Sequence, residues 1–244
     1  MENKTKQLII GHRGYRQKYP ENTALAFEQA VAAKFDGVEL DLQLTKDNHI
    51  VIIHDDNTQR VTGIKKSVNQ SNLKDLKKLN YAAFFKKEMP KQTILTLEEF
   101  LDAYLNKFTL INLELKNESA NLETYVKVFS KIISRFEPLI YTKVIISSFD
   151  LNLLKLTYQF NKKFKYAYLF KKHREMINYF KNHELDFCEY FHVKSNTFYL
   201  HLTNYLKIDK KWGLWTIKTK KTYLKGTKYN QIYAQICDAY LKDK

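Results

Sequence analysis

The stretch VELDLQL (residues 38–44) carries the pattern that decides the fold. Successive side chains of a β-strand point to opposite faces, so Glu39, Asp41 and Gln43 share one face and the four apolar residues share the other. Two carboxylates side by side on a buried strand repel each other and are costly to desolvate. A bound cation would remove both penalties, so the stretch predicts a strand that presents metal ligands.

Three further strand-like runs contain ionisable groups near their ends. LIIGHRG (8–14) and IVIIHD (50–55) lead into histidines, and LINLELK (110–116) places Glu114 and Lys116 on one face. Parallel strands that end at the same edge of a sheet bring such groups together. We therefore expect the four runs to form one polyvalent site.

Strand and helix signals alternate along the chain, which predicts a parallel sheet. The expected strands cover residues 8–12, 37–44, 49–54, 108–115, 143–148, 165–170, 187–193, 213–217 and 231–236. Apolar residues recur with helical spacing in 23–34, 96–106, 122–136 and 150–161. Asn22 or Thr23 can cap the first of these helices, and Thr96-Leu97-Glu98-Glu99 reads as a capping box that opens the second.

Charged residues at the ends of several different strands favour a closed (β/α)8 TIM barrel, whose active site is built at that face. The Gly-rich phosphate fingerprints of an open doubly wound sheet are absent from a chain with only six glycines. Because there are nine strand candidates for eight places, at least one must lie outside the barrel. We expect one domain over residues 1–244, with a small insertion at about 56–93 between the third and fourth candidate strands.

Length and composition exclude several classes of protein. The 244 residues are 44% hydrophobic, enough for a sizeable core, and no apolar run is long enough to span a membrane. A strand-like run from residue 8 leaves no room for a signal peptide before His12, so we expect a cytoplasmic protein. Cys188 and Cys237 lie in apolar or aromatic surroundings and predict buried free thiols, too few for a Cys-based zinc site.

The formal net charge is +15, and most of the excess lies in residues 151–244. A basic half favours anionic partners, such as a phosphate ester or peripheral contact with an anionic membrane. The same bias can come from the lysine-rich composition that an AT-rich genome produces. Five arginines in the chain argue against nucleic acid, which usually requires the guanidinium fork. We expect no obligate protein partner.

The order and spacing of the motifs resemble the glycerophosphodiester phosphodiesterase family. GHRGYRQKYPENTALAFEQAV (11–31) resembles the family's His-Arg-Gly and Pro-Glu-Asn-Thr signature, and DGVELDLQLTKDNHIVIIHDDNTQRVTG (36–63) resembles its Glu-x-Asp and His-Asp elements. Segments similar to later family motifs follow in order at 95–101, 110–116, 144–150 and 213–218. The resemblance implies a TIM barrel that uses a divalent cation to hydrolyse a small-molecule glycerophosphodiester to sn-glycerol 3-phosphate and an alcohol.

The resemblance also implies roles for particular residues. Glu39, Asp41 and Glu114 are the expected metal ligands, and their hard oxygen atoms favour Mg²⁺ or Ca²⁺. His12 and His54 are the expected general acid and base, because an imidazole titrates near neutral pH. The sequence does not say which histidine is the acid, nor whether the attacking group is water or a hydroxyl of the substrate.

Other residues are expected to bind or support the substrate and the metal. Arg13 and Lys116 are the expected phosphate ligands, although Lys116 can pair with Glu114 instead. Trp215 can form a wall for the glycerol carbons or pack in the core. Glu21 can ligate the metal or, with Asn22, support the ligands from behind. Asp55 can orient His54 or cap the next loop.

The sequence departs from the family pattern in three places. Lys218 follows Trp215-Thr216-Ile217 where the family has Asn or Asp, and Leu95 stands where a proline is usual. The last strand, compared over residues 228–235, lacks the family's Thr-Asp and Pro. These changes affect substrate shaping and stability more than the metal and histidine set, and they leave an altered substrate or reduced activity open.

Two alternative functions stay open at this point. One is a lysophospholipase D-like phosphodiesterase, with the aromatic stretch 187–199 as an apolar channel. The other is a non-catalytic barrel that binds an anionic lipid surface through its basic C-terminal half.

Overall fold

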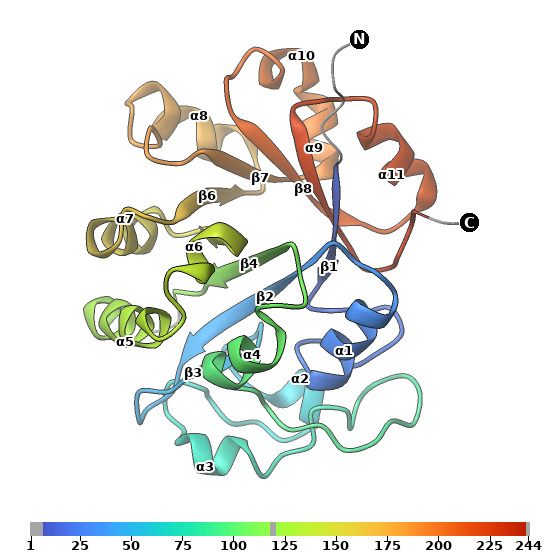
Figure 1. Cartoon of the computed structure of the whole chain (residues 1–244), viewed down its shortest axis with the longest axis vertical. Coiled ribbons are helices and arrows are strands. Elements are labelled where there is room, and N and C mark those ends of the chain that lie inside the picture. Colours follow the sequence, from blue (N-terminus) through green and yellow to red (C-terminus); the bar gives the residue numbers. More distant parts are fainter. Residues whose placement is uncertain (1–6, 118–120, 243–244) are drawn as a thin grey trace.

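The computed structural model describes residues 7–117 and 121–242, and its strands close into a barrel (Figure 1). The strands are β1 Leu8–His12, β2 Gly37–Leu44, β3 Ile50–Ile52, β4 Leu110–Leu115, β5 Val144–Ser148, β6 Lys165–Phe170, β7 Tyr190–Lys194, β8 Lys211–Ile217 and β9 Ile232–Cys237. Eight of them are parallel neighbours in the order β1-β2-β4-β5-β6-β7-β8-β9, and β9 pairs with β1. This closed ring confirms the predicted (β/α)8 TIM barrel.

Helices cover the outside of the barrel (Figure 1). They are α1 Ala24–Ala32, α2 Gln59–Thr62, α3 Leu73–Leu76, α4 Leu97–Tyr104, α5 Leu122–Ser134, α6 Leu139–Lys143, α7 Leu151–Phe160, α8 His173–Lys181, α9 Ser195–Leu200, α10 Leu202–Tyr205 and α11 Lys220–Gly226. The predicted capping box of α4 is present, with Thr96 and Glu99 each bonded to the other's backbone N–H. Thr23, not Asn22, caps α1 through a bond from the Ala26 N–H to its hydroxyl.

β3 is the candidate strand that lies outside the barrel, because it pairs with β2 antiparallel. The chain after it carries α2 and α3 and packs around a small core of its own at the lower end of the molecule in Figure 1. This core contains Val51, Ile53, Val68, Leu76, Leu79, Tyr81 and Ile94. The expectation of one domain over 1–244 with an insertion at about 56–93 stays a prediction.

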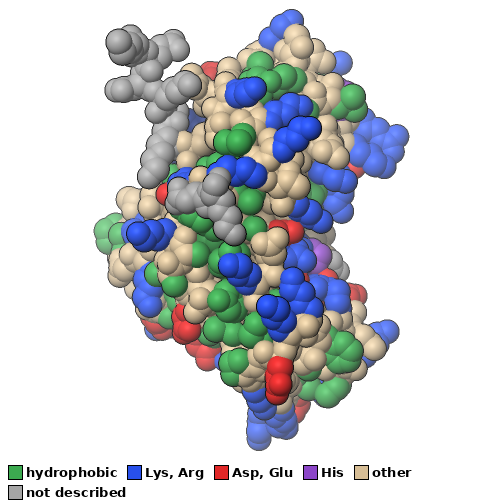
Figure 2. Space-filling view, turned by 90° about the vertical axis from the view of Figure 1, so that its right-hand side faces the viewer, with side chains coloured by type: hydrophobic (Ala, Val, Ile, Leu, Met, Phe, Trp, Pro, Cys, Tyr) green, Lys and Arg blue, Asp and Glu red, His purple; other side chains and the backbone are tan. Residues whose placement is uncertain are grey.

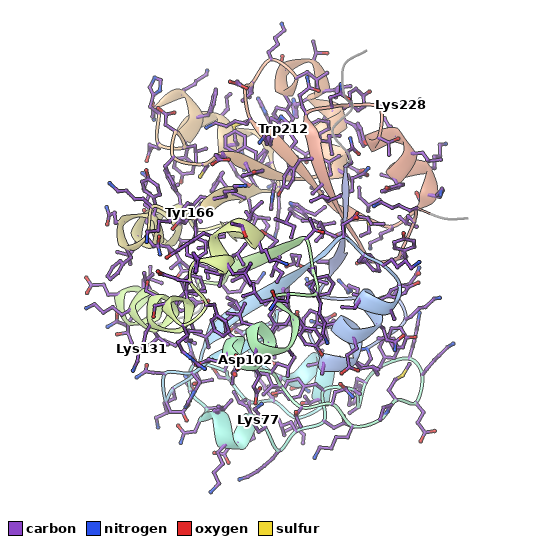
Figure 3. The ribbon with its side chains drawn as sticks, in the orientation of Figure 1. Lys77, Asp102, Lys131, Tyr166, Trp212 and Lys228 are labelled. Atoms are coloured by element: carbon purple, nitrogen blue, oxygen red, sulfur yellow. The ribbon has the colours of Figure 1, made fainter. Side chains whose placement is uncertain are left out.

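The two faces of the barrel strands differ as the alternation in 38–44 predicted. The apolar residues Val38, Leu40 and Leu42 join the large core between the barrel and its helices, whereas Glu39 and Asp41 face the barrel interior beside residues of β1 and β4. Figure 3 shows Tyr166 of β6 and Trp212 of β8 within the molecule and Lys77 and Lys131 towards its outside.

A buried histidine on β7 fills part of the barrel next to a glycine on β8. His192 pairs with Gly213 across the two strands, and its Nε2 lies 2.5 Å from the hydroxyl of Tyr233. Burial lowers the pKa of His192 to about 3. A Cβ atom on Gly213 would lie 2.5 Å from the His192 ring, so this position needs glycine.

Other expectations can be compared directly with the structure. Cys188 and Cys237 are buried free thiols, as predicted. In the aromatic stretch 187–199, Phe191 and Phe198 are fully buried in the core, so these two side chains pack rather than line a channel. Within the described ranges, every helix is too short or too polar to cross a membrane.

Candidate active site

Three carboxylates meet at the C-terminal end of neighbouring strands. Glu39 and Asp41 lie on β2 and Glu114 on β4, where the register places Asp41 directly beside Glu114. One oxygen atom of each residue lies within 4.8 Å of the others, and the three residues are only 3%, 0% and 7% exposed. The three predicted metal ligands are therefore brought together.

The electrostatics of this cluster favour a positive group among the three carboxylates. Burial raises the pKa of Glu39 well above its usual value, and the charges of Asp41 and Glu114 raise it further. Burial likewise raises the pKa of Glu114, although Lys116 opposes the shift. Among the described residues, buried Glu39 Oε1 has no hydrogen-bond partner. A divalent cation fits this site, because it would supply a partner for that atom and allow the carboxylates to ionise together.

Asp41 is contacted by three side chains that the sequence analysis predicted to lie in the site. Arg13 Nε lies 3.2 Å from Asp41 Oδ2, Lys116 Nζ lies 2.9 Å from Oδ1, and Asn22 Nδ2 donates to Oδ2 at 2.9 Å. Burial alone would raise the pKa of Asp41, but the charges of Lys116 and Arg13 lower it far below its usual range. Lys116 also pairs with Glu114. Both expected phosphate ligands thus lie beside the carboxylate cluster.

His12 ends β1 between a cluster carboxylate and a residue that the sequence reading missed. Its Nε2 lies 3.9 Å from Glu39 Oε2, and its Nδ1 lies 2.7 Å from Asp238 Oδ1. Arg16 Nη1 lies 3.2 Å from the same Nδ1. Burial lowers the pKa of His12, and Arg13 and Arg16 act in the same direction, whereas Asp238 opposes them.

His54 follows β3 and has a similar carboxylate partner. Its Nδ1 lies 2.7 Å from Asp55 Oδ1, so Asp55 does orient His54. The loop itself is fixed by Gln43, whose amide donates to the carbonyl oxygens of Ile53, His54 and Asp55 at 3.2, 3.1 and 2.6 Å. Gln43, which shares a face of β2 with Glu39 and Asp41, therefore helps to position His54.

One carboxylate, Glu21, joins three arginines around the site. It accepts from Arg13 Nη1 at 2.8 Å and from Arg60 Nη2 at 2.7 Å, and it lies 3.4 Å from Arg16 Nη2. Arg60 also binds Asp55, with Nε 2.6 Å from Oδ2. Glu21 is outside the carboxylate cluster of Glu39, Asp41 and Glu114, so it supports the site through arginines.

A cavity of about 580 Å³ lies at the C-terminal end of the barrel, next to the carboxylate cluster. His12, Arg13, Glu39, His54, Glu114 and Lys116 all border it. Trp215 forms part of its apolar wall and packs edge-on against Phe149, with 5.6 Å between ring centroids. Lys218 borders a different cavity, beside Arg16 and Asp238.

The structure corrects the reading of the last strand. The comparison over 228–235 missed an aspartate, because β9 runs from Ile232 to Cys237 and the acidic residue follows it at Asp238. A strand end followed by Asp was the available signal. The sequence analysis also missed Asn112, which lies on β4 beside Glu39 of β2 and borders the cavity. Within residues 7–117 and 121–242, its side-chain amide has no hydrogen-bond partner.

Comparison with known proteins gives consistent results. The model of the "Glycerophosphoryl diester phosphodiesterase family" matches residues 12–219. An uncharacterised protein of Mycoplasma genitalium is 35% identical over 235 residues, which cover 96% of each chain. A protein named glycerophosphodiester phosphodiesterase from Caldanaerobacter subterraneus subsp. tengcongensis is 37% identical over 146 residues, which cover 59% of each chain.

Solved structures share the fold over nearly the whole chain. A glycerophosphodiester phosphodiesterase of Thermotoga maritima is 28% identical, with a TM-score of 0.76 and coverage of 96% of this chain and 95% of that one. A phosphodiesterase of Oleispira antarctica, solved with the product sn-glycerol-3-phosphate, has a TM-score of 0.82 at 24% identity and covers 96% and 93% of the two chains.

Proposed function

This chain belongs to the glycerophosphoryl diester phosphodiesterase family, and from that premise we propose that it hydrolyses glycerophosphodiesters to sn-glycerol 3-phosphate and an alcohol. The observation that carries the proposal is a cluster of three buried carboxylates beside a cavity that Glu39, Glu114 and both histidines border. Each histidine is held by its own carboxylate, Asp238 or Asp55, which orients the ring for proton transfer.

Glu39, Asp41 and Glu114 would hold one divalent cation, Mg²⁺ or Ca²⁺. The bound ion would stabilise the negative charge that develops on the phosphoryl oxygens. Arg13 and Lys116 add fixed positive charge beside it, and Asn22 keeps the Asp41 carboxylate in place. A phosphodiester that enters the cavity would exchange some of the Arg13 and Lys116 contacts with carboxylates for contacts with phosphate oxygens.

The two histidines would move the protons of the reaction. One accepts the proton of the attacking group, either water or a hydroxyl of the substrate, as its oxygen forms a bond to phosphorus; in the second case water then opens the cyclic phosphate to give sn-glycerol 3-phosphate. The other donates a proton to the oxygen of the leaving alcohol as its bond to phosphorus breaks. Trp215 would cover the glycerol carbons, because its indole is part of the apolar wall of the cavity.

Hydrolysis of glycerophosphoglycerol by the purified protein tests the proposal, with sn-glycerol 3-phosphate measured as the product. We expect turnover in Mg²⁺ or Ca²⁺ and its loss in excess EDTA. His12→Ala and His54→Ala should each lower kcat by about 10²- to 10⁴-fold. His49→Ala, a change to an exposed histidine outside the cavity, should keep the parental rate.

Near-parental turnover by either His12→Ala or His54→Ala would show that its assigned role is wrong. Full activity in EDTA, after metal has been removed from the protein by dialysis, would refute the metal assignment.

A further inference from the structure

The cavity that the histidines border adjoins a neighbouring one. Phe149, Leu169 and Lys171 border both cavities. The neighbouring cavity has a volume of about 460 Å³ and is also lined by Tyr168, Arg174, Glu175, Asn178 and Tyr179. It lies at the end of β6 and over the first turns of α8.

A third cavity, beside Arg16, Phe84 and Lys218, has no lining residue in common with the catalytic one. The contacts that Arg16 makes with His12 and Glu21 lie between the two. A substrate held in the catalytic cavity can therefore extend past Phe149 without displacing these contacts.

Two cationic side chains face this extension. Lys171 Nζ lies 5.2 Å from the centroid of the Phe149 ring, and Arg174 lies in the first turn of α8. Both side chains are exposed, and in the part of the chain that the structure describes neither has a carboxylate within ion-pair distance. Their charges are available to a ligand.

The two nearby carboxylates are held by the backbone at helix N-termini. Asp150 Oδ1 accepts from the Leu153 N–H at 2.8 Å and caps α7. Glu175 Oε2 accepts from the N–H groups of Lys171 and Lys172 at 2.9 and 3.1 Å. The partial positive charge of a helix N-terminus offsets such carboxylates, so the charge presented to a ligand is positive.

We propose that this extension binds the leaving alcohol of the substrate and that Lys171 and Arg174 select an alcohol with an acidic group of its own over a quaternary ammonium alcohol. The inference rests on the proposed phosphodiesterase function and specifies its substrate class. An anionic group would gain two favourable charge interactions there, whereas a choline group would meet two like charges. The rings of Phe149 and Tyr179 would pack against the carbon chain of either alcohol.

Three diesters with the same glycerophosphoryl half test the selection. Bis(glycerophospho)glycerol has an acidic leaving alcohol, glycerophosphoglycerol a neutral one, and glycerophosphocholine a cationic one. At low ionic strength, kcat/KM for the acidic diester, corrected for its two equivalent ends, should exceed that for glycerophosphocholine on the order of tenfold. The neutral diester should lie between them.

Variants of Lys171 and Arg174 distinguish selection by this subsite from the effect of the protein's overall charge. The double variant Lys171→Met and Arg174→Met should bring the three kcat/KM values close together, and Lys171→Glu should favour glycerophosphocholine. Lys181→Met removes one positive charge at the other end of α8, outside both cavities, and should keep the parental ratio.

The outcomes distinguish the subsite from the underlying activity. Turnover of all three diesters without preference, or an unchanged ratio in the double variant, overturns the subsite and leaves the proposed function intact. Failure to hydrolyse any of the three, the neutral diester included, overturns both.

Discussion

At the scale of single residues, Asp41 shows why the site depends on more than its three clustered carboxylates. Its carboxylate contacts two cations and an amide from three different parts of the chain. Asn22 can reach it because the Asn22 backbone adopts a left-handed φ of 57°, directly before the cap of α1. The Pro-Glu-Asn-Thr segment thus fixes the start of α1 and the Asp41 carboxylate at once.

Loss of the Asn22 amide should weaken metal binding while the fold is retained. Asn22→Gly keeps a residue that tolerates the left-handed backbone and removes the hydrogen bond to Asp41. We expect the affinity for Mg²⁺ or Ca²⁺, measured by isothermal titration calorimetry, to fall about 10- to 100-fold. Asn48→Gly is the matched control, since Asn48 has a φ of 61° in an exposed turn. Equal losses in both variants would contradict the role of Asn22.

Glu21 should make the stability of the protein depend on pH. Burial alone would raise the pKa of Glu21, but the hydrogen bond from Arg60 and the charges of Arg13 and Arg16 lower it to about 2. A lowered pKa in the folded state means that the stabilisation is present above the ordinary value of about 4.5 and is lost as the pH falls towards 2.

We therefore expect Glu21→Gln to be less stable than the parent at pH 7, on the order of 3 kcal/mol, with a smaller difference at pH 3. Urea unfolding at the two pH values measures the free energies of unfolding. A difference that does not shrink in acid would show that the carboxylate charge is unimportant there.

At the scale of elements, the alternating pattern of 38–44 predicted β2 with its bounds and both faces, because the pattern is determined by burial on each side. β3 has equally apolar residues, so periodicity could not show that it pairs antiparallel outside the barrel. The family motif of the last strand was compared with the wrong residues, because only the register of β9 with β1 and β8 shows where that strand ends. The contact between Glu21 and Arg60 joins loops 39 positions apart, and no local pattern encodes it.

The contact between β7 and β8 leads to a prediction about packing. Gly213→Ala would place a methyl group against the His192 ring and should lower the free energy of unfolding by about 1–3 kcal/mol. The same change in a His192→Ala background should cost less, because the clash is removed. Chemical denaturation of the four proteins in this cycle measures the coupling. Purely additive effects would mean that the ring can move aside.

At the scale of the whole molecule, the positive charge is spread widely: Lys and Arg side chains outnumber Asp and Glu over the face shown in Figure 2. The net charge of +15 was evident from composition, but its meaning was not. The structure places three of the five arginines around Glu21, where carboxylates neutralise them. The remaining excess comes largely from exposed lysines, which act on a substrate at long range.

The electrostatic field of the exposed lysines should increase the rate at which anionic substrates associate with the protein. For glycerophosphoglycerol, which carries one negative charge, kcat/KM should fall several-fold between about 20 and 300 mM salt, with kcat nearly constant. Glycerophosphocholine, whose charges cancel, should respond less. Steady-state kinetics with both diesters provides the comparison, and equal salt dependence would argue against steering by the field.

The pairing of β1 with β9 and the contact between His12 and Asp238, 226 positions apart, have a consequence for synthesis in the cell. A chain synthesised only as far as β8 would leave the sheet open beside β1 and would lack the Asp238 carboxylate that contacts His12. We expect a chain truncated before β9 to be inactive.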